Sequence, residues 1–394
     1  MPINTLPKRL QSIDVFRAIT MLLMIFVNDA SSVKNIPAWI DHVAGNEDGL
    51  GFADTVFPAF LFIAGLSIPF AIRNRINKGE SFLSILFYIF TRSFALIVMG
   101  FFHVNSENYN ASLAGFPQPL WIIAITVAFF LIWLDYSHSV PKIKKYILVS
   151  CGVLLLAAMV IIYKGGTLND PEGMKPSWWG ILGIIGWAYL ATAFIFLLTK
   201  GNLYLLAIAF VVAIAVNIAE HTGWIKLNLP FVGDLSSVLL MLGGSVLSVV
   251  YGKFAASGKA VKLVYKCFTA TGLLLIAAGF FVRPYAQGIS KIHSTPAWVF
   301  ICTGISILVF TMLIWLVDVK GKQRFFSVIK PAGTSTLTCY LVPYFLYSLY
   351  NLVGFNYPAF LNVGTGGLIR SITVAFLVIL FTGYLEKKRV RLKV

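Results

Sequence analysis

Residues 52–78 read FADTVFPAFLFIAGLSIPFAIRNRINK, an apolar run that ends in three basic side chains, Arg73, Arg75 and Lys78. The hydrocarbon core of a bilayer is about 30 Å thick, so an α-helix needs roughly 17 to 25 mainly apolar residues to cross it. The run before Arg73 is long enough, and basic residues directly after such a run are typical of its cytoplasmic end. This stretch therefore predicts a membrane-spanning helix.

The same arrangement repeats along the chain and predicts an all-α polytopic membrane protein with about twelve transmembrane helices, within a range of about ten to twelve. The twelve apolar runs are centred near Met21, Phe62, Ala95, Val127, Leu155, Trp187, Ala209, Met241, Leu275, Ser306, Leu341 and Ala375. Of the 31 Lys and Arg residues, 22 fall into short clusters between every second pair of runs. An even number of crossings with this charge bias predicts that both termini are cytoplasmic.

The composition excludes a soluble globular protein. Hydrophobic residues make up 58% and charged residues 12% of the chain, and the mean hydropathy is +0.84, whereas about a quarter of the residues in soluble domains are charged. The formal charge of +16 is mostly a signal of membrane orientation, so we expect no nucleic-acid partner. We predict one transmembrane domain over residues 1–394. Its catalytic core is expected within 8–110, because polar residues inside the apolar runs concentrate there.

The predicted external loop 29–52 is chemically the richest part of the chain. Asn28 closes the first apolar run, Asp54 opens the second, and His42 lies between them beside Asp41. A histidine near acids at a membrane surface suits a general base that takes a proton from an amine or hydroxyl nucleophile. A solvated loop histidine is the more ordinary interpretation of the same spacing. Asn28 as a helix C-terminal cap and Asp54 as a first-turn acid are also ordinary structural roles.

Two arginines lie where a charge needs a partner. Arg92 is near the middle of the third apolar run, where an unpaired cation would cost several kcal/mol, so it must face protein or water. Arg17 can pair with Asp14 three residues earlier on one helix face, either as a structural ion pair or as part of a site with Arg92 for an anionic ligand from the cytoplasm. Arg370, at the external end of the last run, is expected to reach the membrane interface.

Three segments in order resemble the catalytic core of the heparan-alpha-glucosaminide N-acetyltransferase family. They are residues 9–18 (RLQSIDVFRA), 24–28 (MIFVN) and 52–65 (FADTVFPAFLFIAG). Weaker matches follow at residues 91–94 (TRSF) and at Ala332, Gly333 and Tyr340. The resemblance implies a transmembrane acetyltransferase that takes acetyl-CoA as co-substrate from the cytoplasmic face and acetylates an amino sugar or glycan fragment on the opposite face.

The resemblance also implies roles for individual residues. The family's catalytic histidine lies in the loop after the Phe-Val-Asn motif. In this sequence that loop contains one histidine, His42. Asn28 matches the motif's asparagine and is expected to hold the acetyl carbonyl or the acceptor, with Asp54 or Asp41 orienting the imidazole. Direct transfer and a covalent acetyl-His42 intermediate both remain open.

Arg17 and Arg92, with Arg9 and Asp14, are the expected acetyl-CoA-binding residues, and no metal is expected. The loop around His42 departs from the family's spacing, and the extra luminal domain of the lysosomal enzyme has no counterpart in this sequence. A bacterial inner-membrane protein that faces the periplasm is therefore expected.

Two other classes of function remain. One is a secondary transporter for a sugar or another small polar solute, with Arg92 and Asp54 binding the substrate or coupling it to protons. The other is a membrane scaffold without chemistry. A homodimer is possible through small-residue helix faces, for which Gly243 and Gly244, or the glycines of 364–367, are candidates.

Overall fold

The computed structural model describes residues 10–137, 140–227, 229, 231–256 and 261–394, and within these residues the regular secondary structure is almost entirely helical. The predicted all-α fold is confirmed. The α-helices are α1 (Gln11–Ala30), α2 (Ala53–Asn77), α3 (Phe82–Glu107), α4 (Ala111–Ala114), α5 (Gln118–Trp133), α6 (Lys142–Ile162), α7 (Gly180–Leu198), α8 (Leu203–His221), α9 (Ser236–Ala256), α10 (Val261–Val282), α11 (Pro296–Leu313), α12 (Lys330–Thr334), α13 (Thr336–Val353) and α14 (Gly364–Lys387). Short elements complete the described chain: the antiparallel strands β1 (Gly165–Gly166) and β2 (Pro171–Glu172), the π-helix η1 (Ile314–Val319), and the 3-10 helices η2 (Lys322–Phe326) and η3 (Ala359–Leu361).

The chain is a polytopic membrane protein, as predicted. Each of the twelve predicted centres falls in a different helix, namely α1, α2, α3, α5 to α11, α13 and α14. Within the described residues, nine helices are long and apolar enough to cross a membrane, and these are α2, α3, α6 to α11 and α14. α5 is apolar but has only 16 residues. The count of twelve crossings and the cytoplasmic position of both termini stay predictions.

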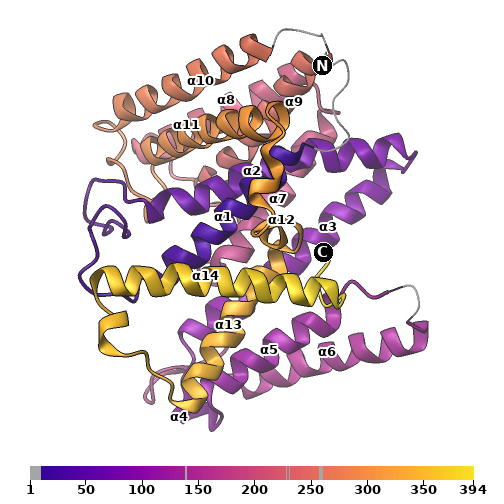
Figure 1. Cartoon of the computed structure of the whole chain (residues 1–394), viewed down its shortest axis with the longest axis vertical. Coiled ribbons are helices and arrows are strands. Elements are labelled where there is room, and N and C mark those ends of the chain that lie inside the picture. The colour runs from indigo at the N-terminus through magenta and orange to yellow at the C-terminus, as the bar shows by residue number, and fades with distance from the viewer. Residues whose placement is uncertain (1–9, 138–139, 228, 230, 257–260) are drawn as a thin grey trace.

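The long helices alternate between two ends of the bundle (Figure 1). At one end, which we call the outer end, Gly49 N–H donates to the Ile289 carbonyl and joins the loop 31–52 to the loop 283–295. At the other end, Asp135 N–H donates to the Arg391 carbonyl. We call this the basic end, because the described Lys and Arg clusters gather there. One end of the bundle is therefore basic, as the charge pattern predicts.

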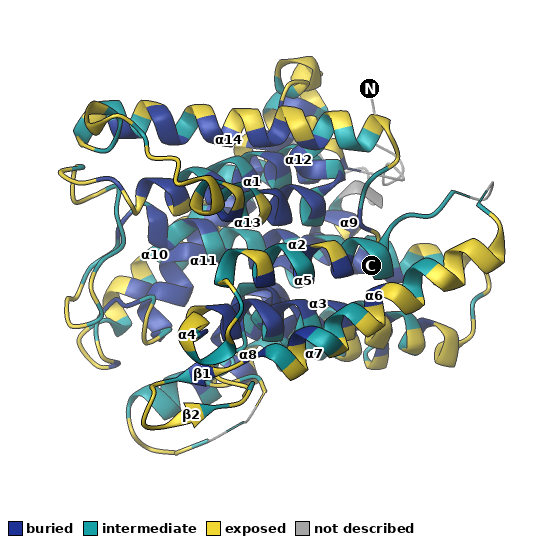
Figure 2. Cartoon of the chain, turned by 90° about the horizontal axis from the view of Figure 1, so that it is seen from below, coloured by how far each residue is buried: buried dark blue, intermediate teal, exposed yellow. Residues whose placement is uncertain are grey.

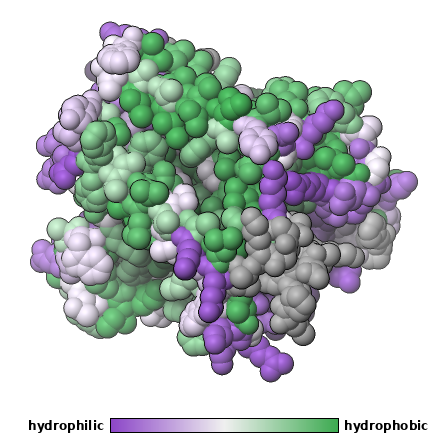
Figure 3. Space-filling model, turned by 90° about the horizontal axis from the view of Figure 1, so that it is seen from above, coloured by the Kyte–Doolittle hydropathy of each residue, from purple (hydrophilic) through white to green (hydrophobic). Residues whose placement is uncertain are grey.

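Apolar side chains cover much of the outside of the bundle. α6 exposes residues along most of its length, whereas α1 is mostly buried (Figure 2). Seen from above, much of the surface is hydrophobic, and hydrophilic residues gather at its margin and in the part next to the residues drawn in grey (Figure 3). An exposed apolar surface of this extent is unusual on a soluble protein. It suits contact with lipid.

Glycines allow neighbouring helices to approach closely. A Cβ on Gly65 of α2 would clash with the Met241 carbonyl of α9, and a Cβ on Gly244 of α9 would clash with the Phe62 carbonyl of α2. α3 and α7 meet at Gly100 in the same way. Close backbone contact of this kind is a main source of helix association in membranes, where lipid removes the hydrophobic driving force.

The glycines that the sequence offers for a homodimer are used inside the chain. Gly244 packs on α2, Gly243 faces Thr303, and Gly367 packs against Val33. Gly244 and Gly367 are thus covered by other parts of the same chain, and a homodimer stays a prediction.

Arg370 does not reach toward the membrane interface, so that expectation is also wrong. Its side chain is buried and donates to Asp29 Oδ1 at 2.9 Å, to Ser32 Oγ at 2.9 Å and to Asn362 Oδ1. Ser371 Oγ also donates to the Asp29 carboxylate at 2.6 Å. A buried charge is tolerated only when it is paired and hydrogen-bonded. This pair fixes the outer end of α1 against α14.

The neighbouring residues Gly244 and Gly243 give a matched test of the α2–α9 contact. We expect Gly244→Ala to lower the stability of the purified protein by roughly 1–3 kcal/mol, as overpacking does, because the new methyl group meets backbone that cannot rotate away. Gly243→Ala should be tolerated, since its Cβ would lie 3.4 Å from Thr303 Cγ2. Unfolding midpoints in detergent measure both, and equal midpoints would contradict this packing.

Candidate functional site

A buried carboxylate organises the outer end of the bundle. Asp54 lies in the first turn of α2, and its side chain is 2% exposed. Its Oδ1 is 2.6 Å from His42 Nδ1, and its Oδ2 accepts the backbone N–H groups of Val43 at 3.0 Å and Gly51 at 3.1 Å. The first turn of a helix favours an anion because its N–H groups are unpaired and its dipole is positive there. The structure thus brings together two of the three predicted catalytic residues.

The contact with Asp54 determines which nitrogen of His42 holds the proton. A neutral imidazole donates from one nitrogen and accepts with the other, and an ionised carboxylate can only accept. His42 Nδ1 therefore donates to Asp54, and Nε2 keeps its lone pair. The side chain is 32% exposed, so the imidazole can be reached from outside the protein. Asp41 contributes differently, because its Oδ1 accepts the backbone N–H of His42 at 2.7 Å.

A lysine that the sequence analysis did not select lies at this pair. Lys291 Nζ is 3.2 Å from His42 Nδ1 and 3.9 Å from Asp54 Oδ1. Burial lowers the pKa of Lys291 below its ordinary value, and the negative charge of Asp54 opposes that shift. Lys291 is 249 residues from His42 in sequence, and no spacing pattern connects them. Only the fold reveals this neighbour.

The loop 283–295 is fastened to the loop of His42 at several points. Ile289 N–H donates to Asp48 Oδ1 at 2.7 Å and keeps the pKa of that carboxyl below its usual value. Arg283 pairs with the other Asp48 oxygen at 2.9 Å, and His293 Nε2 lies 3.1 Å from the Gly45 carbonyl. These contacts hold the backbone on both sides of Lys291 against the site.

Asn28 lies at the same end of the bundle, in the last turn of α1, and its side chain is exposed. Within the described residues it makes no side-chain hydrogen bond to His42 or Asp54, so the structure leaves its amide free to bind another group. Its neighbour Asp29 points inward to Arg370, which fixes the rotation of this helix end.

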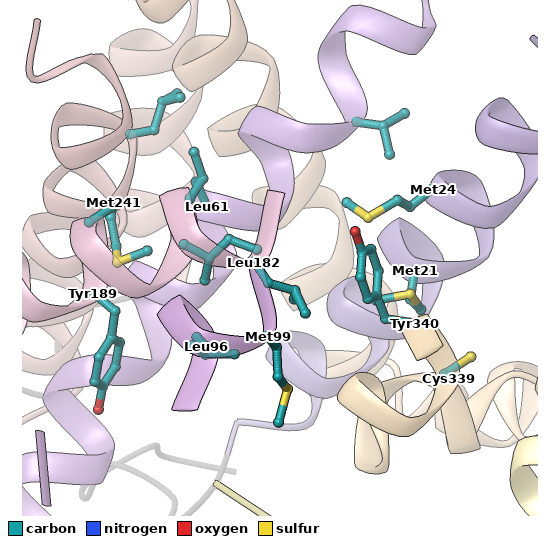
Figure 4. Packing of buried hydrophobic residues seen from close by; sticks show 14 of the residues in the cluster. Met21, Met24, Leu61, Leu96, Met99, Leu182, Tyr189, Met241, Cys339 and Tyr340 are labelled. Atoms are coloured by element: carbon teal, nitrogen blue, oxygen red, sulfur yellow. The ribbon is translucent and has the colours of Figure 1, made fainter. Parts of the chain in front are cut away.

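A cavity of about 340 Å³ lies in the interior of the bundle toward the basic end. Its wall includes Arg17, Arg92 and residues 392–394 of the C-terminal segment, together with Gly333 and Tyr340, two of the weaker sequence matches. The remaining wall is mainly apolar and includes Met21, Met24, Leu96, Leu182 and Tyr189, several of which are shown in Figure 4. Pockets of roughly 300–1,000 Å³ with a few polar groups are typical of small-molecule sites.

The two arginines of the cavity are held differently. Arg17 donates to Ser67 Oγ at 2.6 Å and to the Gly333 carbonyl at 3.3 Å, and lies 3.4 Å from Asp14. Arg92 donates to the Tyr88 hydroxyl at 3.1 Å, and its guanidinium carbon lies 5.1 Å from the centre of the Tyr189 ring.

Arg92 is also incompletely satisfied. Its Nε is buried and has no hydrogen-bond partner within the described residues. A buried donor of a charged group costs free energy when it is unpaired. The described contacts of Arg92 leave this cost in place.

The other two residues expected at the cofactor site have different positions. Asp14 pairs with Arg17, as its spacing predicts, but is not part of the cavity wall. Arg9 lies outside the described residues.

Comparisons with known proteins agree with the resemblance predicted from the N-terminal segments. The model of a family described as a domain of unknown function (DUF5009) matches residues 9–229. Heparan-alpha-glucosaminide N-acetyltransferase of Homo sapiens is 40% identical over 148 residues, which are 36% of this chain and 21% of the human protein. The Mus musculus protein of the same name is 40% identical over 101 residues, which are 26% of this chain and 14% of the mouse protein. The match thus spans less than a quarter of either relative.

Gly51 tests the shape of the loop that surrounds Asp54. A Cβ at this position would clash with the Asp41 carbonyl and lie 3.3 Å from Asp54 Oδ2. We expect Gly51→Ala to displace the loop and to lower the unfolding midpoint. Gly49→Ala is the control, because its Cβ would lie 3.5 Å from Val43 in ordinary contact. Equal midpoints and equal chemical reactivity of His42 in both variants would contradict this geometry.

Proposed function

We propose that this chain, which belongs to the DUF5009 family, is a membrane-embedded acetyltransferase that moves an acetyl group from acetyl-CoA to the amino group of a glucosamine-type sugar. The observation that supports it most directly is the pairing of His42 with the buried Asp54 at 2.6 Å. The similarity to the human N-acetyltransferase gives the class of donor and acceptor.

In this proposal His42 is the general base. The amine of the acceptor attacks the carbonyl carbon of the thioester, His42 Nε2 takes a proton from the attacking nitrogen, and the carbon–sulfur bond breaks to release coenzyme A. Proton transfer by a positioned group contributes about 10²–10⁴-fold to such reactions. Asp54 holds the imidazole with its lone pair on Nε2. The exposed amide of Asn28 donates to the oxyanion that forms on the acetyl group.

α1 links this outer site to the cavity. Arg17, Met21 and Met24 of α1 line the cavity, and Asn28 lies four residues after Met24. Residues three or four apart share one face of a helix. Asn28 therefore extends the face of α1 that lines the cavity by one turn toward the outer end. We propose that the acetyl group reaches Asn28 and His42 along this face.

The cavity is the proposed site for acetyl-CoA, which enters from the basic end. Arg17 and Arg92 provide positive charge in the wall. Acetyl-CoA offers phosphate and carbonyl oxygens as acceptors, and arginine donors bind such groups strongly. The apolar side chains around Met24 and Leu182 suit the uncharged pantetheine arm.

We further propose that the chain resides in a bacterial inner membrane, with the basic end in the cytoplasm and His42 facing the periplasm. The one-sided distribution of Lys and Arg supports this orientation.

His42→Ala tests the central role in this proposal. We expect transfer of labelled acetyl from acetyl-CoA to glucosamine by the detergent-purified protein to fall by about 10²-fold or more, because the general base is lost. Acetyl-CoA binding should remain, since His42 is not part of the cavity wall. His221→Ala is a matched control: His221 also lies at the outer end beside an aspartate, but both of its ring nitrogens have partners, Asp234 and Gln287.

Full activity of His42→Ala would contradict the role of the histidine. Absence of both transfer and acetyl-CoA binding in the unchanged protein would contradict the enzyme. In that case, flux of a sugar into liposomes without an acyl donor would identify a transporter instead.

Arg92→Met tests the cofactor cavity. Hydrogen bonds to charged groups are worth about 1.5–3 kcal/mol, so we expect the KM for acetyl-CoA to rise about tenfold or more, with a smaller effect on the KM for the sugar. Lys144→Met, which changes an exposed lysine at the basic end of α6, should leave both constants unchanged. A selective rise in the sugar KM would move the proposed acceptor site into the cavity.

A further inference from the structure

We infer that Lys291 sets the charge state of the His42–Asp54 pair, so that Asp54 orients the imidazole without making it a permanent cation. The functional meaning of this inference rests on the proposed role of His42 as a base. The contact of Lys291 with His42 and Asp54 does not depend on that role, because it follows from the positions of the three side chains.

The hydrogen-bonding capacity of the imidazole excludes one simple role for Lys291. His42 Nδ1 has a single in-plane position for a proton or a lone pair. Asp54 occupies it at 2.6 Å, the shorter of the two contacts, so Nδ1 is protonated and has no lone pair for the ammonium at 3.2 Å. Lys291 therefore acts on the pair through its charge.

The sign of that effect follows from Coulomb's law. A carboxylate beside an imidazole favours a second proton on the ring, and a nearby cation disfavours it. Asp54 alone would thus favour the imidazolium, which has no lone pair and is not a base. With Lys291 present, the side chains of His42, Asp54 and Lys291 together carry zero charge when the imidazole is neutral. They carry one positive charge when the imidazole is protonated. The ammonium of Lys291 therefore opposes the effect of Asp54 and disfavours a second proton on the ring.

The fold fixes the groups that face Lys291. On the loop of His42 this is the imidazole itself, on α2 it is Asp54, and on α11 it is the thiol of Cys302. Asp41 adds a second carboxylate on the loop of His42, where its Oδ1 accepts the His42 backbone N–H at 2.7 Å, and the Lys291 variants leave it unchanged. Asp48 and Arg283 neutralise each other nearby on the same two loops at 2.9 Å. The side chain of Lys291 is 26% exposed, so water screens the interaction only in part. Its backbone is anchored on both sides, by Ile289 and by His293.

The test measures the protonation of His42 without using enzyme turnover. Diethyl pyrocarbonate modifies neutral imidazole but not imidazolium, and mass spectrometry of the peptide that contains His42 gives its rate of modification as a function of pH. We would compare the unchanged protein with Lys291→Met and Lys291→Arg. Lys226→Met, which removes an exposed lysine of another outer loop, is the control. The pH dependence of acetyl transfer is recorded in parallel.

The rate of modification falls at low pH, and we call this part of the profile its acid limb. We expect the acid limb to move to higher pH by about one unit in Lys291→Met, because loss of the cation makes a second proton on the imidazole more favourable. Lys291→Arg keeps the charge and should stay close to the unchanged protein, as should Lys226→Met. A purely structural role would change the rates at every pH without moving the limb.

Coincident profiles for Lys291→Met and the unchanged protein would overturn the inference. So would a shift in Lys291→Arg as large as that in Lys291→Met. If the methionine variant does not fold, Lys291→Gln provides the same comparison. If the unchanged protein transfers no acetyl group while the limb still moves in Lys291→Met, the proposed function fails and the coupling of Lys291 to His42 stands.

Discussion

The outer end of the molecule depends on the burial of the Asp54 carboxylate. A carboxylate that is 2% exposed is stable only if hydrogen bonds and opposite charge replace the water it has lost. Asp54 recruits these partners from separate parts of the chain: the imidazole and backbone of the His42 loop, and Lys291 from the loop 283–295. The backbone carbonyl of Asp54 also accepts Trp298 Nε1 of α11 at 3.1 Å. Asp54 thus joins α2 to two loops through its carboxylate and to α11 through its backbone carbonyl.

A similar constraint acts at the end of α1. Asp29 and Arg370 are both buried, and their mutual pairing, with donors from Ser371 and Tyr347, satisfies both charges. Asn28, the adjacent residue, is exposed as a consequence, because one face of the last turn of α1 is committed to α14. The structure therefore uses a buried ion pair to present the amide of Asn28, and a buried carboxylate to orient the imidazole of His42.

The sequence predicts those parts of this arrangement that depend on local spacing or on the membrane. All twelve helix centres follow from apolar run length, and the Asp14–Arg17 pair follows from its spacing of three residues. The sequence also predicts that Asn28, His42 and Asp54 lie at one end of the bundle, because Asn28 and Asp54 flank one predicted loop and His42 lies within it. Lys291 and Arg370 could not be placed this way, because their partners lie 249 and 341 residues away. A lysine in an external loop and an arginine at a helix end have the same sequence signature whether they are solvated or paired.

Under the proposed function, the separation of the two sites has a physical rationale. Coenzyme A is highly charged, and moving charge through the hydrocarbon region is costly, whereas the acetyl group is small and uncharged. It is therefore sufficient for the protein to hold the coenzyme from the basic end and to let only the acetyl group reach the outer end. α1 suits this task because it is fixed at both ends, by Arg17 bound to Gly333 and by Asp29 bound to Arg370. A rigid helix between two anchored sites keeps donor and base in a constant relation, which is the requirement for catalysis by proximity.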